Sequence, residues 1–441
     1  MQRPNILFIM SDEHRADVAG FAGNSVVRTP NLDWLAKDGV VFDNAYCPSP
    51  VCVPGRQAIM SGQYCHTCGC MEWRDLPPGH MTLARQFTRH AYRTIACGKL
   101  HHEGADPYQG FIKHIGNEGT ANVSRIPGRV EEEFEKYKIP WQHHKWTQEK
   151  EVKRATFGNS TRDFDDEYAL QGALRYVNSH FVDHDYDRES PLVPLLLYYG
   201  TILPHYPYIA EEQKFRYYLP RVKPFLNQQI FDHEFLSRMK VEVGVDASER
   251  EVRRATAAYY GMVEMVDERA GRLMDAIRFA GQDLDDWIII YTTDHGEMLG
   301  EHGVWEKQKF FEGSVRVPLI IRYPKKFKPA RVSQNVNLID LFATLCELCG
   351  IQTPAGLDSR SLVPLMNGDA SAWDNETASQ YWGHNLMIKR DDLKYHYYKQ
   401  TNTELLFDLA ADPGELRDCG KDPHLATSME YFRASRAKYG F

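Results

Sequence analysis

The chain has 441 residues, a formal net charge of −8 and a sequence pI of about 6.1. Hydrophobic residues make up 43% and charged residues 25%, as is typical of a globular protein, and the length is enough for two or three domains. An acidic chain without a basic run argues against a nucleic-acid partner. No stretch approaches the ~20 apolar residues of a membrane span, so we expect no membrane partner.

The sequence shows neither a secretion signal nor a disulfide framework. The apolar run Asn5–Met10 is too short for a signal peptide, and acidic residues follow it at once. The nine cysteines are odd in number and irregularly spaced, which favours free thiols in a reducing compartment. We therefore expect a cytoplasmic protein, or a periplasmic or secreted one if a leader was removed. The oligomeric state is not readable from the pattern.

Short apolar strands alternate with amphipathic helices, which predicts an α/β fold with a large, mainly parallel sheet flanked by helices. The apolar runs are near-continuous, as expected for strands covered on both faces. The predicted strands are Asn5–Met10, Arg93–Gly98, Pro194–Gly200, Trp287–Thr293 and Val317–Arg322. The predicted helices are Asn31–Asp38, the stretch after Arg56, Met81–His90, Ser248–Phe279, which opens with a capping box to Glu251, and Val336–Cys349.

Two changes in composition and periodicity along the sequence suggest the domain organisation. Residues 1–365 form the predicted α/β domain, and the polar segment 106–188 reads as an insertion over one end of its sheet. In that insertion Trp141, His143, His144 and Trp146 either stack on a sugar or aryl group or form a small core of their own. Residues 366–441 form a smaller C-terminal domain with a short antiparallel sheet and a terminal helix. Its predicted strands are Ala378–Trp382, Leu386–Lys389, Lys394–Lys399 and Glu404–Asp408.

Chemically active side chains follow four of the predicted strands. In open α/β sheets, ligands bind beyond the carboxyl ends of the strands, so these side chains are expected at one edge. Any one of them has a plain structural explanation, such as a carboxylate at a helix N-terminus, but their coincidence indicates a site. Carboxylates suit calcium, magnesium or manganese, and one imidazole shifts the preference toward manganese or zinc. The residues at these strand ends are Asp12 and Glu13, Lys99 and His101, His205, and Asp294 and His295.

At this point the sequence resembles a known family. The stretch Cys52-Val-Pro-Gly-Arg56 matches the signature of formylglycine-dependent sulfatases, which belong to the alkaline-phosphatase-like superfamily. Other blocks look like sulfatase blocks in sulfatase order, and only the insertion is unmatched. These blocks are Arg28–Asp33, Gly39–Tyr46, Met60–Tyr64, Gly98–His101, Asp294–Lys307, Arg316–Leu319, Leu405–Leu409 and Asp412–Glu415.

The resemblance implies a mechanism and a set of roles. A formylglycine-generating enzyme would convert Cys52 to Cα-formylglycine, and its hydrate would attack the sulfur of an aryl or carbohydrate sulfate monoester. Arg56 would hold the formylglycine and the metal carboxylates, and His101 would act as a base. Lys99, His205 and Lys307 would bind the substrate, and His205 or Lys307 would protonate the leaving oxygen. The implied metal ligands are Asp12, Glu13, Cys52, Asp294 and His295, with Ca²⁺ favoured over Mn²⁺, Mg²⁺ or Zn²⁺.

Two departures from the family pattern leave alternatives open. Many sulfatases carry an aspartate where this chain has Glu13 and an asparagine where it has His295. The metal identity is therefore open, and a phosphonate or phosphate ester hydrolase is the alternative function. A non-catalytic module that binds sulfated glycans is the less favoured reading. The cluster Cys65, Cys68 and Cys70 invites a zinc interpretation, but without a second ligand pair we expect it to be structural.

Overall fold

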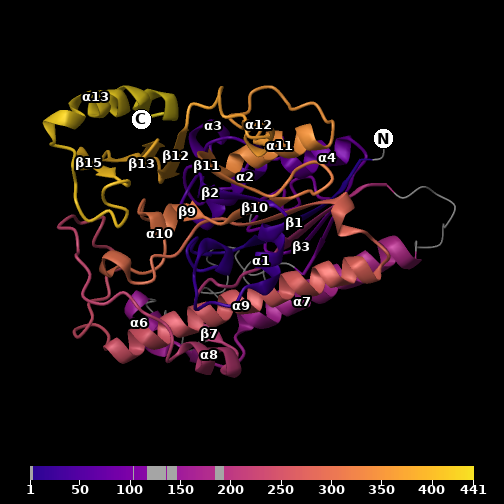
Figure 1. Cartoon of the computed structure of the whole chain (residues 1–441), viewed down its shortest axis with the longest axis horizontal. Coiled ribbons are helices and arrows are strands. Elements are labelled where there is room, and N and C mark those ends of the chain that lie inside the picture. The colour runs from indigo at the N-terminus through magenta and orange to yellow at the C-terminus, as the bar shows by residue number, and fades with distance from the viewer. Residues whose placement is uncertain (1–2, 103, 117–135, 137–146, 184–192) are drawn as a thin grey trace.

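A computed structural model describes residues 3–102, 104–116, 136, 147–183 and 193–441. Within them a nine-stranded sheet has the order β11-β2-β10-β8-β1-β6-β3-β4, and β9 pairs with β2 (Figure 1). Its strands run parallel except β9 and β10, which confirms the predicted mainly parallel α/β fold. The strands are β1 Asn5–Ser11, β2 Val40–Tyr46, β3 Arg93–Gly98, β4 Lys113–Ile115, β6 Leu195–Gly200, β8 Trp287–Thr293, β9 Arg316–Val317, β10 Leu319–Arg322 and β11 Ala330–Asn337.

The centre of the sheet aligns the strand ends that carry the predicted site. β1 lies between β8 and β6, with Ser11 opposite Thr293 and Met10 opposite Gly200. β3 follows on the far side of β6, where Gly98 lies opposite Gly200. Because these strands are parallel and in register, the segments that follow β8, β1, β6 and β3 leave the sheet side by side.

Helices cover both faces of the sheet, which explains the near-continuous apolar strands. On one face, α2, α4 and α11 pack on Phe8 and its neighbours; on the other, α1, α7 and α9 pack on Leu7 and its neighbours (Figure 1). The capping box predicted at Ser248 is present, with Glu251 completing it. The helices are α1 Pro30–Lys37, α2 Cys52–Ser61, α4 Leu83–Arg89, α7 Thr161–Asn178, α9 Glu249–Phe279 and α11 Leu341–Leu348.

The C-terminal part forms the small antiparallel sheet that the sequence predicted. Its strands pair in chain order, and Phe432 of the terminal helix stacks on Tyr395 with ring centroids 5.3 Å apart. Buried Lys394 pairs with Glu415 of the same C-terminal part at 2.8 Å and with Glu312 at 2.9 Å; Glu312 begins the helix α10 (Glu312–Val315), which precedes β9 of the larger sheet. The elements are β12 Glu376–Tyr381, β13 Asn385–Arg390, β14 Leu393–Tyr398, β15 Thr403–Asp408 and α13 Ala426–Ser435.

Two predicted elements differ from the structure. The stretch Val336–Cys349 was expected to be one helix, but Val336 and Asn337 end β11, and α11 begins only at Leu341. The reason is tertiary: β11 pairs with β2, and the Asn337 side chain accepts a hydrogen bond from Ile339 N to start a short 3₁₀ turn. The predicted strand Val317–Arg322 is divided into β9 and β10 at Pro318, which lacks an N–H for the ladder.

The predicted insertion 106–188 contains a helix, α7, that the sequence did not predict and that packs against the sheet. α7 buries Ala169, Leu170, Ala173 and Val177 against the face that includes β3. Trp141, His143, His144 and Trp146, for which the sequence left a stacking role or a small core open, lie outside the described residues. The smaller elements are α3 Cys65–Cys68, β5 Thr156–Phe157, β7 Ile209–Ala210, α6 Gln148–Arg154, α8 Glu212–Tyr218, α10 Glu312–Val315 and α12 Val363–Met366.

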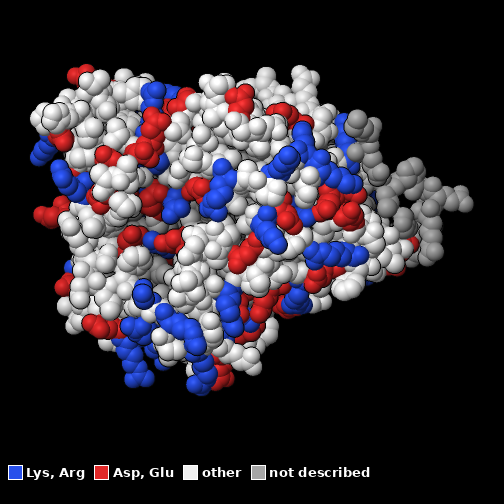
Figure 2. Space-filling model, in the orientation of Figure 1, with Lys and Arg blue, Asp and Glu red and all other residues white. Residues whose placement is uncertain are grey.

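Three further observations concern membrane-spanning helices, surface charge and cysteines. Across the described residues, no helix combines the length and the apolar character needed to cross a membrane. On the face drawn in Figure 2, basic and acidic side chains are interspersed. All nine cysteines are free thiols in the structure.

Candidate active site

The first turn of α2 presents Cys52 at the sheet edge. Cys52 is the first residue of this helix, and all ten helix residues, Cys52–Ser61, are buried. Arg56 lies four residues later and therefore on the same helix face. The Cys-x-x-x-Arg spacing thus directs both side chains toward the ends of β1 and β8. A helix N-terminus also carries a partial positive charge that favours an anion.

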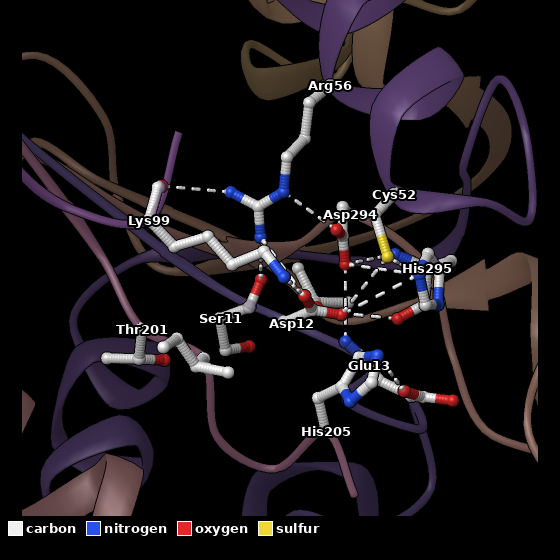
Figure 3. A network of polar contacts seen from close by, with 12 residues as sticks. Ser11, Asp12, Glu13, Cys52, Arg56, Lys99, Thr201, His205, Asp294 and His295 are labelled. Carbon is white, nitrogen blue, oxygen red and sulfur yellow. Dashed lines mark hydrogen bonds and ion pairs between the residues drawn. The ribbon is translucent and has the colours of Figure 1, made fainter. Parts of the chain in front are cut away.

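Cys52 lies in a buried cluster of potential metal ligands (Figure 3). Its Sγ is 3.1 Å from His295 Nε2 and 3.8 Å from Asp12 Oδ1. His295 Nε2 is in turn 3.6 Å from Asp12 Oδ1 and 3.7 Å from Asp294 Oδ1. All four side chains belong to residues that are 2% exposed or less. The structure therefore brings together four of the five predicted metal ligands.

His295 has the tautomer that a metal ligand requires. Its Nδ1 lies 3.0 Å from the carbonyl oxygen of Gly296, which can only accept a hydrogen bond. Burial lowers the pKa of His295, so the ring is neutral and its one proton is on Nδ1. The lone pair of Nε2 then faces Cys52 and the two carboxylates, an arrangement common among metal-binding histidines.

Glu13, the fifth predicted ligand, belongs to an adjoining group with Asp12 and His205. Its backbone has a φ of 65°, a left-handed conformation that is uncommon outside glycine and is often found at functional sites. Its Oε2 accepts from Lys307 Nζ at 2.8 Å, whereas its buried Oε1 has no hydrogen-bond partner among the described residues. The Oε1 atom of Glu13 is therefore available as a ligand for a cation bound beside Asp12.

Arg56 holds the buried residues of the site in place through several hydrogen bonds. Its Nε donates to Asp294 Oδ2 at 2.8 Å, and Nη1 donates to Tyr198 OH at 2.9 Å. Nη2 donates to the carbonyl oxygen of Ser11 at 3.1 Å. The side chain is fully buried, so removing it would leave Asp294 charged and poorly compensated.

Lys99, at the end of β3, forms an ion pair with Asp12. Burial by itself would raise the pKa of Asp12, but the charge of Lys99, together with that of Arg56, holds it well below its ordinary value. Asp12 is therefore ionised, as a metal ligand must be. Figure 3 shows the Lys99 side chain directed toward Asp12.

Lys307 and His205 form a pair with defined proton positions. His205 Nδ1 is 2.7 Å from the carbonyl oxygen of Tyr206, so the proton of the neutral ring is on Nδ1. Burial and the charge of Lys307 lower the pKa of His205 well below its ordinary value, which keeps the ring neutral. His205 Nε2 therefore accepts from Lys307 Nζ at 2.8 Å. The residues flanking Lys307, Glu306 and Gln308, have φ values of 67° and 73°, which set the local direction of the lysine.

His101 lies two residues beyond Lys99 and contacts a residue that the sequence did not single out. Its φ is 58°, and its ring packs edge-on against Trp73 with centroids 5.0 Å apart. Trp73 is 43% exposed, and its loop is held by Asp75, which accepts from Gly104 N at 2.6 Å. Nothing in the sequence near Trp73 marked it, because the contact joins a loop after α3 to the end of β3.

The cysteines Cys65, Cys68 and Cys70 are buried beside α2. Cys65 Sγ lies near the carbonyl oxygens of Pro48 and Pro54, at 3.8 and 3.7 Å. Among the described residues, the groups able to hold a metal are the two around Asp12, and these cysteines are in neither. Their packing agrees with the structural role expected from the sequence.

Comparisons with known proteins agree with this geometry. The model of the sulfatase family matches residues 4–351, and that of the N-sulphoglucosamine sulphohydrolase C-terminal region matches residues 300–435. A choline-sulfatase of Rhizobium meliloti is 30% identical over 96% of this chain and 83% of its own length.

Two solved structures share the fold. A phosphonate monoester hydrolase of Agrobacterium radiobacter has a TM-score of 0.78 at 22% identity and covers 99% of this chain and 95% of its own. A structure described as BT4656 with its substrate D-glucosamine-2-N,6-O-disulfate has a TM-score of 0.78 at 19% identity, covering 100% and 98%. The family match spans most of the chain, and the buried cysteine, arginine and carboxylate cluster occupies the sheet edge. The chain belongs to the sulfatase family and is a sulfuric ester hydrolase.

Proposed function

We propose that the protein hydrolyses an aryl or carbohydrate sulfate monoester with a formylglycine hydrate made from Cys52 and one divalent metal ion. The observation that carries this proposal is the position of Cys52 Sγ, 3.1 Å from His295 Nε2 within a cluster that includes Asp12 and Asp294. The hydrated aldehyde would supply a nucleophilic oxygen, and the metal would lower the pKa of that oxygen.

The donors around Cys52 fit a divalent cation. Asp12 and Asp294 supply carboxylate oxygens, and His295 supplies a bare Nε2. The buried Oε1 of Glu13 has no hydrogen-bond partner among the described residues and lies in the adjoining group. Oxygen donors favour Ca²⁺ in this proposal, and the imidazole keeps Mn²⁺, Mg²⁺ and Zn²⁺ as alternatives.

The cations of the site would bind the sulfate group. Lys99 follows β3 and Lys307 lies in the long segment between β8 and β9, and the N-terminus of α2 adds partial positive charge. Arg56 is already committed to Asp294, Tyr198 and Ser11, so we assign it a positioning role. Its bonds would keep the carboxylate and the nucleophile in a fixed geometry.

Proton transfer to the leaving oxygen is assigned to Lys307. His205 Nε2 accepts a hydrogen bond from Lys307, so the histidine has no proton to give at that atom. Although burial opposes it, the charge of Glu13 holds the pKa of Lys307 well above its ordinary value and keeps the ammonium protonated. Lys307 would donate the proton while His205 orients it. His101 is the proposed base for the second step, as the family resemblance implies.

Maturation and location complete the proposal. A formylglycine-generating enzyme would act on Cys52 before or during folding, because this cysteine is 2% exposed in the folded chain. We propose a cytoplasmic location, with a periplasmic or secreted one if a leader was removed. The structural neighbour described with a sulfated glucosamine supports a carbohydrate sulfate, whereas the relative named a choline-sulfatase supports only sulfate ester hydrolysis in general.

The proposal is tested on protein made with a formylglycine-generating enzyme. Mass spectrometry of the peptide containing Cys52 should show the aldehyde, and elemental analysis should show one divalent metal per chain. Treatment with a chelator should abolish turnover of 4-nitrophenyl sulfate, and Ca²⁺ should restore it. An unmodified thiol in fully active protein would contradict the mechanism. Faster turnover of an aryl phosphonate than of the aryl sulfate would instead favour the alternative, a phosphonate ester hydrolase.

A further inference from the structure

A buried carboxylate outside the active site holds the turn that carries His205. The turn 202–205 follows β6 and is closed by a hydrogen bond of 3.0 Å from His205 N to the carbonyl oxygen of Ile202. Asp166 of α7 is 1% exposed. Its Oδ1 accepts from Ile202 N at 2.6 Å, and its Oδ2 accepts from Leu203 N at 3.0 Å. One side chain thus fixes two consecutive peptide groups at the start of the turn.

The same turn bonds to two residues of the site. The carbonyl oxygen of Leu203 accepts hydrogen bonds from Thr201 Oγ1 at 2.9 Å and from the backbone N–H of Asp12 at 3.4 Å. At the other end of the turn, His205 Nε2 accepts from Lys307 Nζ at 2.8 Å. A displacement of the turn would therefore move the ring that orients the proposed proton donor.

Asp166 is held in turn by contacts between α7 and α9. Asp163 of α7 pairs with Arg269 of α9, and Glu167 binds Arg272 through two bonds of 2.7 Å. Burial raises the pKa of Asp166 to about 6, so the group is mostly ionised at neutral pH and both of its oxygens can accept. The contacts therefore run from α9 through Asp166 to the turn.

We propose that Asp166 is a positioning residue for proton transfer to the leaving oxygen. In that step the bond from sulfur to the leaving oxygen breaks, its electron pair stays on that oxygen, and a proton passes to it from Lys307 Nζ. Asp166 acts through the turn 202–205, which keeps His205 Nε2 against the lysine. The proposal deepens the function proposed above and rests on it. Misplacing a reacting group by about 1 Å can cost on the order of 100-fold in rate.

The test measures how the effect of a substitution depends on the leaving group. Asp166→Asn keeps one acceptor oxygen and places an amide NH₂ against the second backbone N–H, which displaces the turn. In metal-loaded protein that contains formylglycine, we expect kcat for phenyl sulfate to fall about tenfold. The fall for 4-nitrophenyl sulfate should be less than about threefold, because nitrophenolate leaves without a proton. Asp166→Glu, whose carboxylate lies one methylene further out, is the second variant if Asp166→Asn does not fold.

A double-mutant cycle separates positioning from general destabilisation. Asp166→Asn should add almost no loss on phenyl sulfate to that of Lys307→Ala, because the group it acts through is already absent. The matched control is Asp267→Asn. Asp267 of α9 is also buried, and its oxygens accept from consecutive backbone N–H groups at the start of α1, Leu32 N at 2.7 Å and Asn31 N at 3.3 Å. Its substitution should lower thermal stability and leave the ratio of the two kcat values unchanged.

A crystal structure of Asp166→Asn gives a readout that needs no turnover. The distance from His205 Nε2 to Lys307 Nζ should increase beyond hydrogen-bond length, to about 3.5 Å or more. An unchanged distance of 2.8 Å, equal losses on the two esters, additive losses in the double variant, or the same change of ratio in Asp267→Asn would each overturn the proposal.

Failure of the proposed function has a different signature. Neither ester is then hydrolysed by the wild type, or Lys307→Ala loses equally on both esters. In either case the distance between His205 and Lys307 in Asp166→Asn still decides whether Asp166 positions this pair.

Discussion

The floor and the rim of the site are built differently. The floor comprises Asp12, Cys52, Arg56, Asp294 and His295, all buried and joined by short polar contacts. At the rim lies Trp73, which is 43% exposed and packs edge-on against His101. Floor residues hold one another whatever the substrate is, whereas Trp73 is open to solvent. Under the proposed mechanism, the difference separates residues that carry out the reaction from a residue that could contact the leaving group.

Burial makes the floor intolerant of change. Removing one partner of a buried ion pair leaves the other charge uncompensated, at a cost of roughly 3–5 kcal/mol. Replacing an exposed aromatic side chain at the rim leaves no buried charge behind. Variants of the floor should therefore need a stability measurement beside each activity measurement, and variants of the rim should not.

The largest expected effect is at Cys52. Cys52→Ala removes the precursor of the nucleophile, so we expect kcat on 4-nitrophenyl sulfate to fall by at least about 1000-fold. Steady-state kinetics measure the loss, and thermal unfolding shows that the fold survives. Cys346→Ala removes another buried free thiol, in α11, and should retain activity. Unchanged turnover in Cys52→Ala would show that the reaction does not use a nucleophile made from Cys52.

Lys307→Ala should sharpen the assignment of the proton donor. If Lys307 protonates the leaving oxygen, loss of about 100-fold in kcat is expected for a sugar sulfate, whose alcohol needs a proton to leave. The loss should be several-fold smaller for 4-nitrophenyl sulfate, because the nitrophenolate leaves without one. Kinetics with both substrates give the ratio. An equal loss on both would assign Lys307 to sulfate binding alone.

Trp73→Ala tests the rim. The indole beside His101 offers an aromatic surface to the leaving group, so we expect KM for an aryl sulfate to rise about fivefold, as stacking energies suggest, with kcat nearly unchanged. Phe279→Ala, which removes an aromatic ring that is 89% exposed at the end of α9, should change neither constant. A fall in kcat without a change in KM would move Trp73 from the rim to the catalytic floor.

The smallest expected effect on activity is at His302, where the change should appear in fold stability instead. His302 stacks on Phe311 with centroids 4.0 Å apart, and burial lowers its pKa to about 4. The unfolded chain binds this proton near pH 6.5, so stability falls as the pH falls from 6.5 to 4, by up to about 3 kcal/mol from this residue.

Denaturant unfolding at a series of pH values measures this slope, which should be smaller in His302→Phe. The exposed His384 provides the matched control, since His384→Phe should leave the slope unchanged. Activity at neutral pH should be retained in both variants, because neither residue lies at the floor or the rim. An unaltered slope in His302→Phe would show that other groups carry the acid sensitivity.

Local patterns were sufficient for much of the fold. The runs that became β1 and β8 are apolar along most of their length, and the Ser248 capping box is a purely local signal. β2 escaped prediction because Asp43 and Asn44 interrupt its apolar pattern on a partly exposed stretch. The α7 helix was missed because its small buried face, Ala169 to Val177, lies among charged residues.

The sequence by itself determined the α/β architecture and the Cys52–Arg56 spacing, because both depend on periodicity within one element. Only the tertiary structure decided the tautomers and hydrogen-bond directions of the site residues. The lone pair of His295, the direction of the Lys307–His205 hydrogen bond and the place of Trp73 depend on contacts between segments far apart in the chain. No local pattern encodes such distances.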